Sequence, residues 1–159
     1  MKRKTASGVM GLGLLGTIVL FVTGSNGFTG ESASQKAVRQ AYQKLLSTNV
    51  SFAFGGVGFA GVTSDGEKAF HTIAGSTNAL ELFRAIARDG NPEGQMYGLC
   101  GIRKLEPESF DAFAKPIVSA NPKVWTMSGC LRSEEPAPAV VRRIARGSYD
   151  RDFEKGRAW

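Results

Sequence analysis

Histidine and cysteine are scarce in this chain of 159 residues, which contains only His71, Cys100 and Cys130 of these two types. A structural zinc site needs about four ligands, so three such side chains do not make a metal site. The phrases G-x-S-x-G, H-R-D and D-F-G, which mark serine hydrolases and protein kinases, are absent as well. The sequence therefore predicts no metal, no cofactor and no catalytic residue, and it favours a protein that is not an enzyme.

Acidic residues are missing from residues 1–30, which also contain the longest run without any charged residue. Lys2, Arg3 and Lys4 precede this run, and its most apolar part extends over residues 8–24. A basic flank before an apolar run of this length is typical of a cleaved signal peptide and of an uncleaved membrane anchor. A buried core helix is disfavoured, because the run has no polar face.

Both interpretations export the remainder of the chain, and the sequence leaves them open. The apolar run lies at the lower limit for a membrane span, whereas no clear cleavage site follows it. An anchor would cross the membrane through residues 5–24 and place the body outside the cytoplasm, since the basic residues stand before it. A cleaved signal peptide would release the body as a periplasmic or secreted protein.

Charge of one sign is not concentrated in the body of the chain. The formal net charge of +6 includes three basic residues that precede the apolar run, which leaves +3 for residues 31–159. Proteins that bind nucleic acids carry a concentrated basic face or a recognisable reader motif, and the sequence has neither. We therefore expect the partner to be a protein or a peptide and not a nucleic acid.

Apolar residues at helical spacing predict that the body, residues 31–147, is mostly α-helical. Ser32 and Gln35 stand in capping-box spacing before the first apolar stripe, and Ser64 precedes a second stripe. Asn91 before Pro92 is typical of a helix start, because the first helical position needs no N–H. The predicted helices cover residues 32–49, 64–75, 79–88, 91–105, 106–120 and 137–147.

Three further segments have less regular patterns. Residues 50–54 alternate in apolar character, which predicts a short strand or an extended loop. Residues 123–133 fit either a short strand or a helical turn. Residues 148–159 are charged and lack periodicity, so we expect a C-terminal tail that docks weakly or not at all.

The two cysteines suggest a disulfide if the body is exported. In an oxidising compartment, two thiols that come close usually pair. A disulfide between Cys100 and Cys130 would close a loop of about 30 residues and contribute roughly 3 to 4 kcal/mol to stability. The alternative is a pair of separate free cysteines that pack as small apolar side chains. We expect the disulfide.

A helical pair in the middle of the chain carries a resemblance to known proteins. The segment STNALELFRAIARDGNPEGQMYGLCGIRKL has an apolar first helix, an Asn-Pro turn, and the small residues Gly98, Cys100 and Gly101 in its second helix. With the helix that follows, residues 76–120 resemble HEAT-type α-helical repeats. The phrases GVTSDGEKAF, GQMYGLCGI and TMSGC also resemble small, exported, uncharacterised bacterial proteins. The resemblance implies a HEAT-like hairpin and no activity; since only one pair is clear, a compact helical bundle stays open.

One glycine-rich stretch has the spacing of a nucleotide-binding motif. Gly56, Gly58 and Gly61 form G-x-G-x-x-G, which in dinucleotide-binding proteins opens a helix and is followed by a second parallel strand. Here the helix cap is Ser64, three residues beyond the motif, and helices follow instead of a strand. We therefore interpret the glycines as positions for tight turns or for close backbone packing beneath Phe52, Phe54 and Phe59.

The remaining titratable groups have simple structural interpretations. Glu106 and Glu108, and likewise Glu134 and Glu135, border prolines, so we interpret both pairs as turn residues and not as catalytic carboxylates. His71 has no nucleophile that the sequence identifies, and we expect it to be solvated or to lie next to a helix cap.

These patterns predict an exported or membrane-anchored helical module without catalytic activity, which presents a fixed groove or face to a protein or peptide. The alternative is a small envelope enzyme that uses the loop of residues 55–61 together with Ser64 and His71. A structure distinguishes the two, because an enzyme must bring these side chains and their polar partners into one pocket.

Overall fold

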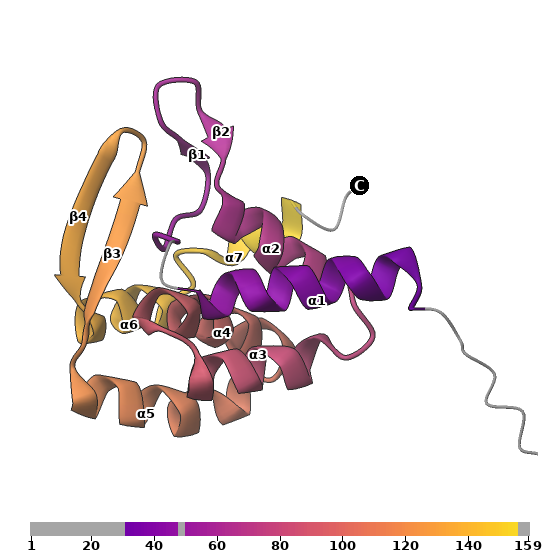
Figure 1. Ribbon diagram of the computed structural model, residues 1–159. Helices are drawn as coiled ribbons and strands as arrows, with labels where there is room; N and C mark the ends of the chain where they lie inside the picture. Colours follow the sequence, from indigo (N-terminus) through magenta and orange to yellow (C-terminus); the bar gives the residue numbers. More distant parts are fainter. Residues whose placement is uncertain (1–30, 48–49, 156–159) are drawn as a thin grey trace, which may run out of the picture. The chain divides into compact units, whose positions relative to one another are not determined.

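The computed structural model describes residues 31–47 and 50–155, so the predicted signal peptide or anchor lies outside this part of the chain. The described residues form seven α-helices and two β-hairpins (Figure 1). None of these helices is both long enough and apolar enough to cross a bilayer. In chain order the elements are α1 (Ala33–Leu46), β1 (Gly56–Val57), β2 (Val62–Thr63), α2 (Asp65–Ala74), α3 (Ala79–Asp89), α4 (Pro92–Leu105), a 3-10 turn (Pro107–Ser109), α5 (Phe110–Ala120), β3 (Lys123–Ser128), β4 (Leu131–Pro136), α6 (Ala137–Ala145) and α7 (Asp150–Lys155).

Three helices begin where their capping residues predict. The Gln35 N–H donates to Ser32 Oγ at 3.1 Å, and the Ser32 N–H donates to Gln35 Oε1 at 2.9 Å, which is a complete capping box. Ser64 and Asn91 each accept an N–H from the residue three positions along the chain. The mostly helical fold that the sequence predicts is therefore confirmed, with two small hairpins added to it.

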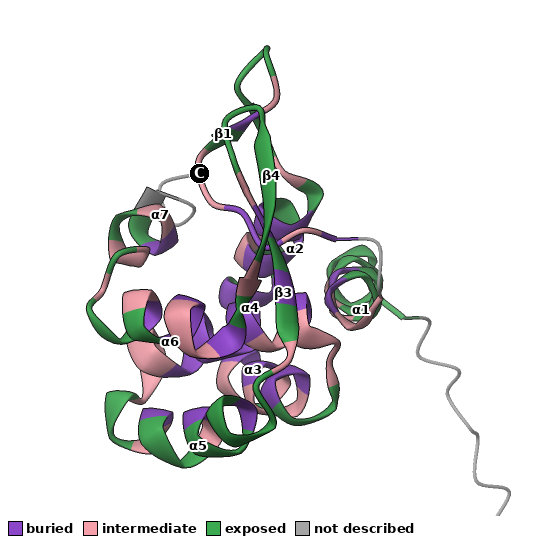
Figure 2. Ribbon diagram, turned by 90° about the vertical axis from the view of Figure 1, so that its left-hand side faces the viewer, coloured by how far each residue is buried: buried purple, intermediate pink, exposed green. Residues whose placement is uncertain are grey.

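Helix α4 lies at the centre of the core, and nine of its residues are buried (Figure 2). A Cβ built on Gly98 would lie 2.7 Å from the Ala87 nitrogen and 2.8 Å from the Phe83 carbonyl oxygen, both in α3. A Cβ on Gly101 would overlap the Phe83 ring. The two glycines therefore let α3 and α4 approach closely, as the small residues of this helix predict.

Residues 123–133, whose sequence fits either a short strand or a helical turn, are extended and form β3, a two-residue loop and the start of β4. β3 and β4 pair antiparallel across a two-residue loop, in which Gly129 has a φ of 55°. Phe52 lies beside β3 in the parallel sense: its N–H donates to the Trp125 carbonyl at 2.7 Å, and its carbonyl accepts the Met127 N–H at 3.0 Å. The extended conformation predicted for residues 50–54 thus serves to continue the sheet. Both hairpins lie on one side of the helices, and α5 lies on the other (Figures 1 and 2).

The interpretation of Glu134 and Glu135 as turn residues is wrong, because both lie in β4. The interpretation relied on Pro136, but this proline ends the strand and stands at the N-cap of α6 without forming a turn. Glu106 and Glu108 do lie in a turn, where α4 ends and the 3-10 turn begins.

The expectation of a loosely docked tail is wrong for residues 148–155. This segment contains α7, and its Phe153 is 3% exposed within the hydrophobic core. Tyr149 packs against the same core, and Arg103 of α4 forms an ion pair with Asp150 at 3.1 Å. Sequence periodicity does not detect this docking, because a helix of six residues has too few turns to repeat an apolar position.

Replacing Phe153 with Ala is expected to lower the free energy of unfolding by about 3 kcal/mol, because the change removes a buried aromatic ring and leaves a cavity. Arg151→Ala, at an exposed position of the same helix, should change it by less than about 0.5 kcal/mol. Chemical denaturation of the two variants measures both effects. A loss at Phe153 no larger than that at Arg151 would contradict the docking of α7.

Candidate binding site

The glycine-rich loop forms the β1–β2 hairpin and does not open a helix, as the loop of a dinucleotide-binding motif does. Gly58 and Gly61 have φ values of 71° and 60°, which suit tight turns, and α2 begins only at Asp65. The glycines do not lie beneath Phe59, which is fully exposed at the tip of the hairpin. That part of the packing interpretation is therefore wrong, whereas the turn interpretation is confirmed.

Ser64 and His71 do not form a catalytic pair. Ser64 Oγ accepts the Glu67 N–H at 3.0 Å and donates to the Ala53 carbonyl at 3.2 Å, so the hydroxyl serves as a helix cap and a tie. His71 lies seven residues further along α2, which is about 10 Å along the helix axis. A hollow of about 290 Å³ beside the glycine loop includes Ser64 in its lining but not His71.

His71 instead lies half-buried beside a carboxylate on its own helix. Its Nε2 is 3.6 Å from Oε1 of Glu67, one turn away. Burial lowers the pKa of His71 below its ordinary value of 6.5, and the charge of Asp152 only partly opposes this. The imidazole is therefore mostly neutral at pH 7, and its Nδ1 has no hydrogen-bond partner among the described residues.

The cysteines are free in the structure, and the predicted disulfide is not formed. Cys100 is buried in α4, whereas Cys130 is exposed in the loop between β3 and β4. This hairpin projects away from the helices, so its tip lies apart from the centre of α4 (Figure 1). The described residues also contain no group of three or more His, Cys, Asp or Glu side chains arranged to hold a metal ion.

Tyr97 of α4 is an important buried group that sequence reasoning missed. Its hydroxyl accepts the Ala53 N–H at 2.9 Å and donates to the Ala53 carbonyl at 2.8 Å. Burial raises the pKa of Tyr97 far above its ordinary value, so the phenol stays protonated. The side chain thus supplies hydrogen bonds to a buried backbone segment that has no helix to satisfy it.

Tyr97→Phe is expected to lower the free energy of unfolding by about 1 to 3 kcal/mol, because the Ala53 N–H would remain buried without its partner. Tyr42→Phe, on α1 at a half-buried position, is the matched control and should cost less. Urea denaturation provides the comparison. Equal stability of the two variants would show that the Tyr97 hydroxyl does not hold the segment.

A polar cluster lines a hollow of about 350 Å³ between the β3–β4 hairpin and α6. Arg143 of α6 donates to both carboxylate oxygens of Glu135, at 2.7 and 2.9 Å, and its Nε donates to the Tyr149 hydroxyl at 3.1 Å. Thr126 Oγ1 donates to the same carboxylate at 2.7 Å. Three donors therefore bind Glu135, which makes it a structural anion and a poor general base.

Glu135 should make stability depend on pH. The Arg143 guanidinium holds the pKa of this carboxyl below its ordinary value of 4.5, with a further contribution from Thr126. A group with a lowered folded-state pKa stabilises the fold above its unfolded pKa, and this stabilisation is lost as the pH falls through the folded value. Glu135→Gln is therefore expected to destabilise the protein at pH 7 and to lose that effect below the folded pKa. Glu108→Gln, on an exposed residue of the 3-10 turn, is the control; a pH-independent difference for Glu135→Gln would contradict the assignment.

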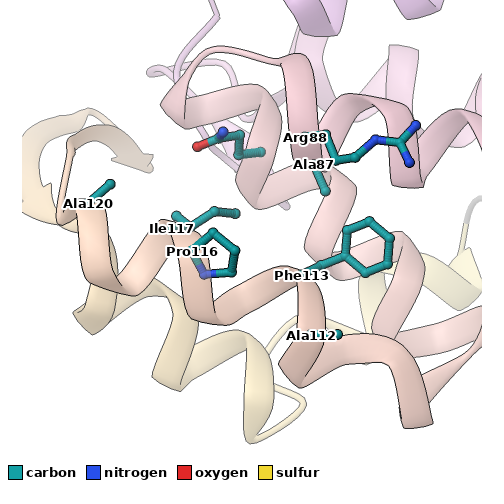
Figure 3. Close-up of a pocket in the computed structure, with 8 residues that line it drawn as sticks. Ala87, Arg88, Ala112, Phe113, Pro116, Ile117 and Ala120 are labelled. Carbon is teal, nitrogen blue, oxygen red and sulfur yellow. The ribbon is translucent and has the colours of Figure 1, made fainter.

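An apolar groove of about 470 Å³ lies between α5 and the α3–α4 pair (Figure 3). Pro116 and Ile117 of α5 face Ala87 of α3 across it, and the Phe113 ring closes one end (Figure 3). Arg88 is the one charged residue in its lining, and no ion pair joins Arg88 to another residue of the described chain. The lining residues are Ala87, Arg88, Gln95, Ala112, Phe113, Pro116, Ile117 and Ala120.

A proline inside α5 leaves one backbone carbonyl of this helix without its usual donor. Pro116 has no N–H, so it cannot donate to the carbonyl of Ala112, four residues earlier in the helix. Both residues line the groove, and Ala112 is exposed. The groove combines apolar walls with two polar side chains, the Gln95 amide and the Arg88 guanidinium, which is the composition of ligand sites in general.

Neither a protein-family model, nor a curated protein, nor a solved structure matches this chain.

Proposed function

We propose that the protein is a non-catalytic binding module, exported or membrane-anchored through residues 5–24, whose helical body holds a segment of another protein in the groove between α3 and α5. The observation that carries the proposal is the apolar lining of this groove on the side of the molecule away from the hairpins. The HEAT-like arrangement implied for residues 76–120 belongs to the same proposal, because such helical arrays present grooves of this kind.

The chemistry of the groove specifies its partner. Small or flat side chains, Ala87, Ala112 and Pro116, leave room for bulky apolar groups, and an amphipathic helix supplies such groups on one face. Arg88 at the rim favours an acidic residue on that helix, since its guanidinium has no carboxylate partner among the described residues. The expected ligand is thus an amphipathic, acidic helical segment.

The catalytic alternative has less support from the geometry. Ser64 caps a helix, His71 lies about two turns away, and Glu135 is fixed by Arg143. An enzyme at these positions would need a nucleophile and a base within hydrogen-bond reach of each other.

Peptide selection tests the groove. A phage-displayed library of random peptides is selected on the full chain in mild detergent, and the enriched peptides are measured by fluorescence anisotropy. We expect apolar residues at helical spacing with acidic neighbours, and we expect Ala112→Trp to weaken their binding by more than about tenfold, because the indole fills the groove. Arg88→Glu should weaken it as well.

Lys115→Trp provides the matched control, because Lys115 is exposed on α5 outside the groove lining. This variant should bind the selected peptides as the unmodified chain does. Selection of no helical peptide, or equal loss of binding in Lys115→Trp and Ala112→Trp, would contradict the proposal.

A further inference from the structure

The outer edge of β4 has unpaired backbone groups, and the hydrogen bonds of β3 show which residues of β4 carry them. On β3, the Trp125 carbonyl and the Met127 N–H bond to Phe52, so these two residues direct their backbone groups away from β4. In an antiparallel pair the direction alternates, and Thr126 therefore faces its register partner Ser133. On β4, the backbone N–H and C=O groups of Ser133 then point towards β3. The same groups of its neighbours Arg132 and Glu134 point outward, away from β3.

This edge is open in the described chain. The first four residues of β4 are exposed (Figure 2), and no other strand pairs with its outer side. Arg132 and Glu134 stand two residues apart, so their side chains project from the same face of the sheet. The Arg132 guanidinium lies 4.4 Å from the centre of the Trp125 ring, which fixes it on the face opposite the polar cluster.

Charge selects one register in which two such edges can pair. In a two-fold symmetric antiparallel pair centred on Ser133, each Arg132 stands opposite a Glu134, and the outward N–H and C=O groups meet in two hydrogen-bonded pairs. A shift of the centre to Arg132 or to Glu134 would place two like charges directly opposite each other, which is destabilising. The edge is thus complementary to itself in one register and repulsive in the neighbouring two.

We propose that β4 is a self-association site, at which two copies of this chain join their hairpins into one continuous antiparallel sheet about Ser133. The interface is small compared with that of a permanent dimer, so the association is weak and concentration-dependent. Charges on an edge strand normally discourage foreign strands, and here the alternation of sign restricts pairing to a second copy.

Charge exchange tests the register. Sedimentation equilibrium of the full chain in mild detergent is compared for the unmodified chain, R132E, E134R and the double variant R132E/E134R. Each single change puts like charges opposite each other at both pairs, and we expect it to weaken dimerisation by about tenfold. The double variant restores opposite charges and should recover the affinity, although it also loses the contact of Arg132 with Trp125. Equal effects of the single and double changes, or a monomer at every concentration, would overturn the proposal.

A cysteine at the two-fold axis gives an independent readout. S133C in a C130S background places two thiols in a directly opposed, non-hydrogen-bonded pair, where the Cβ atoms are close enough for a disulfide. Mild oxidation should therefore produce a covalent dimer. The unmodified chain should not cross-link through Cys130, because in this register each Cys130 lies six residues along the strand from the other. Cross-linking of S133C no faster than that of the unmodified chain would refute the β4 interface even if a charge variant failed to fold.

Discussion

The two hydrogen bonds between the Tyr97 hydroxyl and the Ala53 backbone connect the helical core to the sheet. Tyr97 comes from α4, the most buried helix, and Ala53 adjoins the residue that pairs with β3. Phe52 donates its N–H to the Trp125 carbonyl and accepts the Met127 N–H. These bonds to a core residue fix the direction in which the backbone groups of β3 point. The same contact therefore decides which groups of β4 remain at the open edge. Ser64 binds the same Ala53 carbonyl, so the start of α2 also depends on this segment.

Features that depend on near neighbours in the sequence were predicted well, and features that depend on tertiary contacts were not. Ser32, Ser64 and Asn91 cap their helices, because a cap needs only the next few residues. The prediction of a Cys100–Cys130 disulfide was wrong, because a disulfide requires two segments distant in the sequence to meet. Here Cys130 lies at the tip of a hairpin, away from Cys100 in α4. β4 was missed because its sequence, LRSEEP, lacks apolar alternation. Such a strand is stabilised by its partner and not by a buried face of its own.

The candidate groove could be anticipated only in outline. Pro116 stands within the helix predicted for residues 106–120, and α5 continues through it to Ala120. The apolar hollow beside this proline appears only when α3, α4 and α5 are placed together. The polar cluster around Glu135 likewise joins β4, β3 and α6, and it depends on Glu135 lying in a strand and not in a turn. In both cases the sequence shows the residue types, but it does not show which residues lie beside one another in the fold.

The two proposed surfaces are compatible, because they share no residue and lie on different elements. The groove is built from α3, α4 and α5, whereas the open edge belongs to β4 on the hairpin side of the molecule. Pairing through β4 would therefore leave both grooves free and relate them by a two-fold axis. A partner with two helical segments, or a partner that is itself dimeric, would then bind at an effective concentration set by the spacing of the grooves. Weak affinity at each surface is consistent with this arrangement, since two grooves that bind one partner together bind it more tightly than either groove alone. Because the dimer forms only at sufficient concentration, the strength of this binding depends on how many copies of the module lie close together.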